Sequence, residues 1–258
     1  MLRQEIYQTE IQARKAIGIF DYFEGYYTYQ SPEFPTYWMG NGIEILTSRD
    51  RTFEDWQRLF ERHFDPQKFK HRVFTFLENP DLDFLKKMAS EAGYEVIDSP
   101  MMFASKVPKL ASLAKSWEIK QIKTPKDFAN FRHFRTLTNP ENEWFAKEGF
   151  DKSRVKDDFL KTEWYAIVPK GGEEVLSAMG LFRHNDIARL QEVDTHPDYR
   201  RRGFASQLLK HVLDLGIRQW GCKGVSLFSE ISDPAVGLYH KVGFETIGYH
   251  VELLKAPE

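Results

Sequence analysis

The sequence is poor in cysteine, long apolar runs and net charge, and each shortage excludes a class of protein. Its single cysteine, Cys222, cannot form an internal disulfide, and with no histidine predicted beside it we interpret it as a small residue at a turn rather than a catalytic thiol. No apolar run approaches the roughly 20 residues needed to cross a bilayer, and residues 1–20 lack the apolar core of a signal peptide. We therefore expect a cytoplasmic protein without a membrane partner.

The balance of charges argues against a dedicated nucleic-acid-binding protein. The chain has 36 Lys and Arg residues and 38 Asp and Glu residues, a formal net charge of -2, whereas nucleic-acid binders usually carry a basic excess. A local basic pocket stays compatible with this balance. With 258 residues, 41% of them hydrophobic, the chain is long enough for one large soluble domain or two ordinary ones.

The most informative stretch is LQEVDTHPDYRRRGFASQLL, residues 190–209. A strand-like run leads into a basic turn with a glycine, Gly203, and then into an amphipathic helix predicted from Arg202. The first N–H groups of a helix have no intrahelical partner and lie at the positive end of its dipole, which favours anions. Gly203 lets the backbone close on a phosphate, and Arg200, Arg201 and Arg202 add fixed charge. This order of elements predicts a pyrophosphate site.

Local patterns predict helices and strands throughout the chain. Before residue 106 we expect helices at 4–20, 53–63 and 81–92 and strands at 42–46, 73–77 and 94–105, the last as a strand or a hairpin. After residue 116 we expect strands at 117–122, 164–168, 175–182, 187–194, 224–229 and 246–255, with the second to fourth as an antiparallel meander. The helices of this part are expected from Thr124-Pro125, at 152–162, from Arg202 and at 234–242. Aromatic residues between 21 and 38 are interpreted as core and edge packing rather than as a pocket.

The loss of periodicity at residues 106–116 divides the chain. We predict an N-terminal accessory domain at 1–108, a linker at 109–116 and a second domain at 117–258. Residues 74–106 and 227–255 echo each other: in both, a strand leads through an acidic loop with proline into a short helix that ends at glycine and an aromatic residue, and another strand follows. The first domain is therefore interpreted as a shortened, degenerate copy of the second, with chance similarity as the open alternative.

Two motifs in residues 117–258 resemble those of the GNAT superfamily of acyl-CoA-dependent N-acetyltransferases. RRRGFA at 200–205 matches its Gln/Arg-x-x-Gly-x-Gly/Ala signature, and SDPAVGLYHKVGF at 232–244 matches its later element. The resemblance implies an α/β fold in which a mixed, mostly antiparallel twisted sheet is flanked by helices. It makes the smaller N-terminal α/β subdomain a candidate truncated GNAT-like half.

The resemblance also implies binding residues for acetyl-CoA, which would serve as co-substrate, and no metal. The cofactor's pyrophosphate would lie over the basic turn, formed by Arg200, Arg201, Arg202, Gly203, Phe204 and Ala205. The main chain of Val193, Asp194 and Thr195 would pair with the pantetheine arm like an added strand. Ser232 would contact the same arm, although many family members carry asparagine at this position.

The implied chemistry is direct attack of a neutral amine on a thioester. Tyr239 matches the family tyrosine that protonates the departing thiolate; plain helix packing is its other interpretation. Glu192 is the candidate base, with His196 behind it, acting directly or through water. Glu192 could equally face solvent or pair with an arginine, and His196 beside Pro197 could be structural.

The sequence indicates only the region of the chain that would form the acceptor site, not the acceptor itself. In this family the first two helices and their loop shape the acceptor site, which points to Asn139, Glu141, Asn142, Glu143 and Trp144. Acidic residues there would suit a cationic amine of a small molecule, an amino acid or a peptide. The alternative to an N-acetyltransferase is a non-catalytic acyl-CoA-binding or sensing protein, and a homodimer is left open. An unrelated phosphate-binding protein would need a Walker-type motif, which the sequence lacks.

Overall fold

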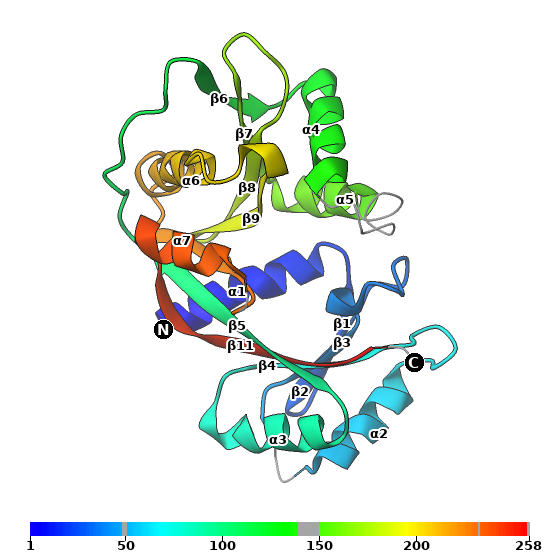
Figure 1. Ribbon diagram of the computed structural model, residues 1–258. Coiled ribbons are helices and arrows are strands. Elements are labelled where there is room, and N and C mark those ends of the chain that lie inside the picture. The colour runs from blue at the N-terminus through cyan, green and yellow to red at the C-terminus, as the bar shows by residue number, and fades with distance from the viewer. Residues whose placement is uncertain (48–50, 139–149, 232, 257–258) are drawn as a thin grey trace. The chain divides into compact units, whose positions relative to one another are not determined.

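The computed structural model describes residues 1–47, 51–138, 150–231 and 233–256 (Figure 1). The chain forms two compact units, and each is built from segments that are not contiguous in the sequence. Unit 1 comprises Met1–Met101, Phe228–Asp233 and Thr246–Glu258, and unit 2 comprises Met102–Leu227 and Pro234–Glu245. These units describe the packing of the chain; the division into domains at 1–108 and 117–258 stays a prediction.

Unit 2 is built on a mostly antiparallel sheet in the order β10-β9-β8-β7-β6. Its strands are β6 (Trp117–Ile122), β7 (Glu163–Pro169), β8 (Ser177–His184), β9 (Ile187–Thr195) and β10 (Gly224–Phe228). β6 to β9 pair antiparallel, as the predicted meander requires, and β10 pairs parallel to β9. The helices are α4 (Pro125–Thr138), α5 (Phe150–Leu160), α6 (Phe204–Asp214) and α7 (Ala235–Val242).

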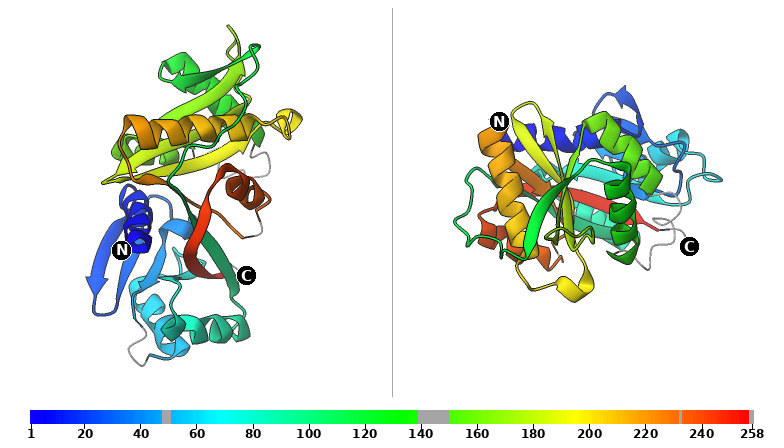
Figure 2. Two further views of the ribbon diagram at one scale, coloured as in Figure 1. Left: turned by 90° about the vertical axis from the view of Figure 1, so that its left-hand side faces the viewer. Right: turned by 90° about the horizontal axis from the view of Figure 1, so that it is seen from above.

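Successive side chains along the strands of this sheet pack into two separate hydrophobic cores, one on each face. On β7, Tyr165 and Ile167 join the cluster that contains the buried face of α6, whereas Trp164, Ala166 and Val168 join the cluster of α4. This follows from the two-residue period of a strand. The sheet of unit 2 therefore lies between α6 on one face and α4 with α5 on the other (Figure 2).

Unit 1 contains a second sheet segment in the order β1-β2-β3-β4-β11-β5. Its strands are β1 (Ile19–Phe23), β2 (Tyr26–Gln30), β3 (Gly42–Ile45), β4 (Arg72–Leu77), β5 (Glu95–Ala104) and β11 (Glu245–Lys255), and its helices are α1 (Leu2–Lys15), α2 (Phe53–His63) and α3 (Asp83–Glu91). A capping box starts α2, with Thr52 and Asp55 bonded reciprocally. Of the aromatic residues in the first hairpin, Tyr26, Tyr27 and Tyr29 are buried, as the packing interpretation expects.

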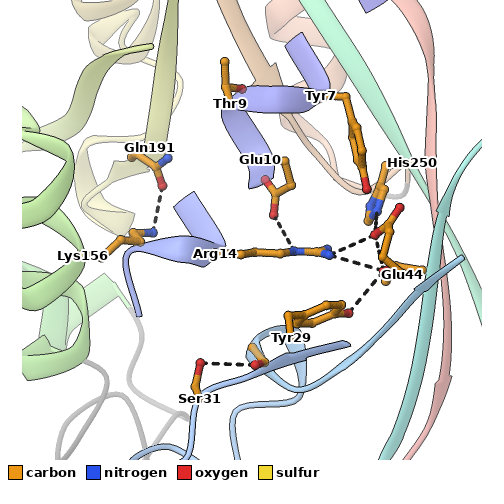
Figure 3. A network of polar contacts seen from close by, with 12 residues as sticks. Tyr7, Thr9, Glu10, Arg14, Tyr29, Ser31, Glu44, Lys156, Gln191 and His250 are labelled. Atoms are coloured by element: carbon orange, nitrogen blue, oxygen red, sulfur yellow. Dashed lines mark hydrogen bonds and ion pairs between the residues drawn. The ribbon is translucent and has the colours of Figure 1, made fainter. Parts of the chain in front are cut away.

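The two faces of this sheet differ in chemistry. One face packs apolar residues such as Phe74 and Val251 against α2 and α3. The other carries a row of polar residues that are neighbours on adjacent strands: Tyr27, Glu44, Thr75 and Glu252. Helix α1 covers this polar face, so the row is buried beneath it (Figure 3).

Arg14 of α1 compensates the buried charge of this row (Figure 3). Its Nη1 donates to Glu44 Oε2 at 3.2 Å and to Thr75 Oγ1 at 3.3 Å, and its Nε donates to Glu10 at 3.3 Å. Burial by itself raises the pKa of Glu44, but the hydrogen bond and charge of His250 and the charge of Arg14 together hold that pKa below its ordinary value. Glu44 is therefore an ionised carboxylate whose burial depends on the charge of Arg14.

The echo noticed in the sequence is confirmed at the level of secondary structure. β4, α3 and β5 repeat as β10, α7 and β11, and both helices stop at a glycine with positive φ, Gly93 at 77° and Gly243 at 104°. β11 follows α7 along the chain but pairs antiparallel with β4 in unit 1. The last strand of the second half thus completes the sheet segment of the first.

The predicted mixed α/β fold is confirmed, and three local expectations need correction. The helix expected at 4–20 ends at Lys15, because the chain turns there into the β1–β2 hairpin. Residues 94–105 form one strand, β5, rather than a hairpin. The helix expected from Arg202 begins at Phe204, because Gly203 has the left-handed conformation and is the N-cap.

Arg14→Met should lower the free energy of unfolding by about 3–5 kcal/mol, because it leaves Glu44 buried without its cation. Arg58→Met is the matched control: Arg58 bonds Asp55 at 2.9 Å but its side chain is 66% exposed, so its loss should cost under about 1 kcal/mol. Urea denaturation at neutral pH measures both. Equal losses in the two variants would contradict the dependence of Glu44 on Arg14.

Candidate functional site

The end of β9 departs from regular strand geometry. Its pairing with β8 shifts between Gly180↔Gln191 and Ala178↔Asp194, so Glu192 and Val193 together oppose a single residue, Met179. Glu192 has a φ of 48°, which is uncommon for a residue with a Cβ. This β-bulge bends the strand, as bulges do beside functional sites.

β9 and β10 separate where the bulge begins. Their parallel ladder runs only from Ile187↔Gly224 to Arg189↔Ser226, although both strands continue beyond it. The ladder thus ends before the main chain of Val193, Asp194 and Thr195, the residues for which a strand-like ligand contact is predicted.

The main chain at this strand end already makes two contacts with nearby side chains. The carbonyl of Asp194 accepts a hydrogen bond from Ser177 Oγ at 2.9 Å, and the carbonyl of Thr195 accepts one from Arg200 Nε at 3.2 Å. Arg200 thereby links the basic turn to the strand end.

The basic turn has a conformation suited to an anion. Two of its residues have positive φ, Arg201 at 61° and Gly203 at 81°, and α6 starts directly after them. The side chains of Arg200, Arg201 and Arg202 are exposed. A Cβ built on Gly203 would meet nothing within 4 Å, so glycine is favoured here by its φ alone rather than by lack of space.

Aromatic side chains pack against the basic turn at residues 200–203. Phe204 is buried and meets Trp117 edge-on, with ring centroids 5.3 Å apart, and the guanidinium of Arg202 lies over the ring of Tyr199 at 5.0 Å. The next helical turns bury Leu208, Leu209 and Val212 as predicted. The first N–H groups of α6, the left-handed backbone and the exposed arginines are donors of the kind that bind phosphate groups, and pyrophosphate binding at this turn stays a prediction.

Glu192 and Asp194 both contact Arg135 of α4. Arg135 Nη2 lies 2.5 Å from Glu192 Oε2, and its Nη1 lies 2.5 Å from Asp194 Oδ2. Lys156 of α5 lies 3.9 Å from Glu192 Oε1 and donates to Gln191 Oε1 at 2.9 Å (Figure 3). The arginine pairing weighed for Glu192 is thus the arrangement found, and its role as a base stays a prediction.

The other predicted residues of the reaction lie in unit 2 as well. His196 caps the short 3-10 turn Pro197–Tyr199, where its Nδ1 accepts from the N–H of Asp198 at 3.3 Å. Tyr239 of α7 is buried in the core cluster that includes Leu208 of α6, with its ring 5.9 Å from that of Phe244. Packing and proton donation both remain compatible with this position of Tyr239.

Several predicted residues lie outside the described part of the chain. These are Ser232 and the acceptor candidates Asn139, Glu141, Asn142, Glu143 and Trp144. Within residues 1–47, 51–138, 150–231 and 233–256, no cluster of three or more His, Cys, Asp or Glu residues could hold a metal ion. In the same residues, no helix combines the length and apolar character needed to cross a membrane.

Asp157 of α5 is a further ionisable group beside this cluster that the sequence interpretation missed. Its Oδ2 accepts from Trp164 Nε1 at 2.8 Å. Burial raises the pKa of its carboxyl to about 6; Lys156 opposes that rise and Glu192 adds to it. Arg135, Lys156 and Gln191 were also missed as site residues, although a charged residue among the phenylalanines of α4 was a signal for the first.

A family comparison agrees with the GNAT-like fold of unit 2. Residues 131–244 match the profile of the Acetyltransferase (GNAT) family, so this part of the chain is a GNAT acetyltransferase domain. The match supports acyl transfer in general. No curated protein matches the sequence.

Solved structures with the same fold extend over nearly the whole chain. A functionally unknown conserved protein from Staphylococcus epidermidis has a TM-score of 0.75 at 15% identity, covering 93% of this chain and 95% of that one. A GCN5-related N-acetyltransferase from Kribbella flavida has a TM-score of 0.69 at 12% identity, with 98% and 95% covered. A tandem GNAT protein from the clavulanic acid biosynthesis pathway has a TM-score of 0.61 at 11% identity, with 93% and 83% covered. At these identities the likeness concerns the fold alone.

Asp157→Asn should remove a pH dependence of stability. The carboxyl has a pKa of about 6 in the fold and of about 3.9 in an unfolded chain. The native state therefore binds the proton more tightly, and the resulting stabilisation, complete below about pH 4, is lost as pH rises through 6. The asparagine keeps an acceptor for Trp164, so above pH 7 this variant should be more stable than the parent by about 1–2 kcal/mol.

The measurement is urea denaturation at about pH 4.5 and pH 8. The exposed neighbour Asp158 provides the control variant Asp158→Asn, which should change stability little at either pH. A stability difference for Asp157→Asn that is the same at both pH values would contradict the raised pKa.

Proposed function

We propose that the protein is an N-acetyltransferase that transfers the acetyl group of acetyl-CoA to a primary amine of a small molecule, an amino acid or a peptide. The observation that carries this proposal is the unbroken succession of the β9 bulge, the divergence from β10 and the Arg200–Gly203 turn at the start of α6. In a GNAT domain this succession offers a pyrophosphate site and a strand end side by side.

Under this proposal the chain's residues divide into three groups. The turn residues Arg200, Arg201, Arg202 and Gly203, with the first N–H groups of α6 at Phe204 and Ala205, bind the pyrophosphate. The main chain of Val193, Asp194 and Thr195 pairs with the pantetheine arm, which Ser232 also contacts. Tyr239 donates a proton and Glu192 accepts one.

Acetyl-CoA supplies the thioester carbonyl and a thiolate leaving group. The strand end holds that carbonyl against the incoming amine, and its N–H groups are suited to stabilising the charge that develops on the carbonyl oxygen. Tyr239 donates its hydroxyl proton to the sulfur as the C–S bond breaks and the C–N bond forms. The proton lost by the amine passes to Glu192, directly or through water.

A panel of primary amines, scored by thiol release from acetyl-CoA, tests the reaction. Turnover with an amine and formation of its acetamide would support the proposal. Tight coenzyme A binding without turnover of any amine would instead favour a non-catalytic acyl-CoA sensor. Size-exclusion chromatography of the same preparation would decide between a monomer and the homodimer left open above.

Arg202→Glu should weaken coenzyme A binding by at least about tenfold, because it places an acid where the pyrophosphate is expected. Titration calorimetry measures the affinity. Arg218→Glu makes the same charge change about 20 Å further along the α6 axis, and it should leave affinity nearly unchanged. Transfer from an acetyl thioester of N-acetylcysteamine, which has no phosphate, should be equal in the parent and in Arg202→Glu. Unchanged coenzyme A affinity in Arg202→Glu would remove the phosphate assignment.

Tyr239→Phe should lower kcat by about 10²-fold or more and leave coenzyme A affinity unchanged, because it removes a proton donor but keeps the buried ring. Tyr165→Phe is the control: it removes a hydroxyl of the same unit that bonds Glu163 at 2.5 Å. The pH profile of kcat separates the two interpretations of Tyr239, because only loss of the acid removes the decline at high pH. Full activity of Tyr239→Phe would assign the proton transfer to another group.

A further inference from the structure

We propose that Arg135 is a positioning residue that holds the end of β9 in its bulged conformation, a statement that rests on the function proposed above. Arg135 contributes no group to the reacting atoms in this assignment. It acts through Glu192 and Asp194, whose carboxylates it binds from α4.

The first argument is geometric. A guanidinium presents several N–H donors in a rigid plane, so its two terminal nitrogens can bind two carboxylates at a fixed separation. In Arg135, Nη2 contacts Glu192 and Nη1 contacts Asp194, each at 2.5 Å. The guanidinium therefore spans Val193, the residue between them, and fixes the spacing of the two side chains that flank it.

The second argument concerns the backbone between these contacts. Glu192 holds a left-handed φ of 48°, a conformation that costs on the order of 1 kcal/mol or more for a non-glycine residue. The Val193 side chain packs against the core cluster on the α6 side of the sheet, whereas the flanking carboxylates reach Arg135 on the α4 side. Contacts on both faces of the sheet therefore hold this short segment, which would otherwise relax toward an ordinary strand.

The third argument concerns charge. Arg135 is 5% exposed, and burial of a guanidinium is tolerated when it is paired with hydrogen-bonding anions. Two carboxylates on alternate positions of one strand repel each other unless a cation lies between them. A lysine would keep the charge but binds as a single point, so the proposal predicts that lysine cannot replace Arg135.

The test compares Arg135→Lys, Arg135→Gln and Arg135→Ala with the parent. Amide hydrogen exchange of the peptide covering residues 190–195 should speed up in all three variants. The kcat/KM for acetyl-CoA should fall by about 10- to 100-fold, the scale expected when reacting groups are misplaced by about 1 Å. Free guanidinium should restore part of the activity of Arg135→Ala, which a merely structural loss would not allow.

Arg218→Gln is the matched control, because Arg218 also binds a carboxylate, Asp214 at 2.8 Å, but its side chain is 68% exposed. It should leave exchange and kinetics unchanged. Should the glutamine and alanine variants fail to fold, Arg135→Lys decides alone: parent-like exchange at 190–195 together with parent-like kcat/KM would overturn the proposal. The exchange arm does not depend on catalysis, so a parent protein without acyltransfer would refute the proposed function while the effect of Arg135 on β9 is still measured.

Discussion

The main chain of a β-strand can bind a ligand only where its ladder with a neighbouring strand stops. In unit 2 this constraint points to the end of β9. The ladder with β10 ends at Arg189, and the bulge at Glu192 turns the strand just beyond this point. The chain then reaches the arginine turn and α6 within a few residues. The end of the ladder, the bulge and the turn are thus consecutive in the sequence, and this succession is the one on which the proposed binding of acetyl-CoA rests.

Side-chain contacts add to the β8–β9 pairing that flanks the bulge on both sides. Arg135 binds the carboxylates on both sides of Val193, and Lys156 bonds Gln191 just before them. Helices α4 and α5 therefore do more than cover an apolar face, because they hold the strand end in a conformation that an isolated strand would not keep.

The first half of the chain repeats the strand, helix and strand of the second half without its arginine turn. Its sheet has an apolar face under α2 and α3, and a buried polar row that Arg14 compensates under α1. Oε2 of Glu44 in that row accepts hydrogen bonds from Arg14 and Thr75. We interpret this polar layer as a stabilising feature of unit 1 whose specificity comes from charge pairing.

Local features were predictable from the sequence because their causes are local. The capping box of Thr52 and Asp55, the stop at Gly93 and the start of α6 after a basic turn each depend on residues a few positions apart, and so does the GNAT resemblance of residues 200–205. The exact start of α6 was not predictable in this way. The helix begins at Phe204 rather than Arg202, because the left-handed conformation of Arg201 and Gly203 is set by the turn as a whole.

Tertiary structure decided the features that depend on distant partners. Nothing in a regular strand pattern indicates that Glu192 is a bulge residue, since a bulge is defined by the pairing with β8. Arg135 and Asp194 are separated by 59 positions, and β11 pairs with β4 rather than staying in unit 2. The sequence by itself determined the types of the elements, the glycine-containing basic turn before a helix and the family resemblance, through periodicity and the φ preferences of single residues. The register of the strands and the partner of each buried charge were decided by the fold, because both depend on which strands and helices meet in space.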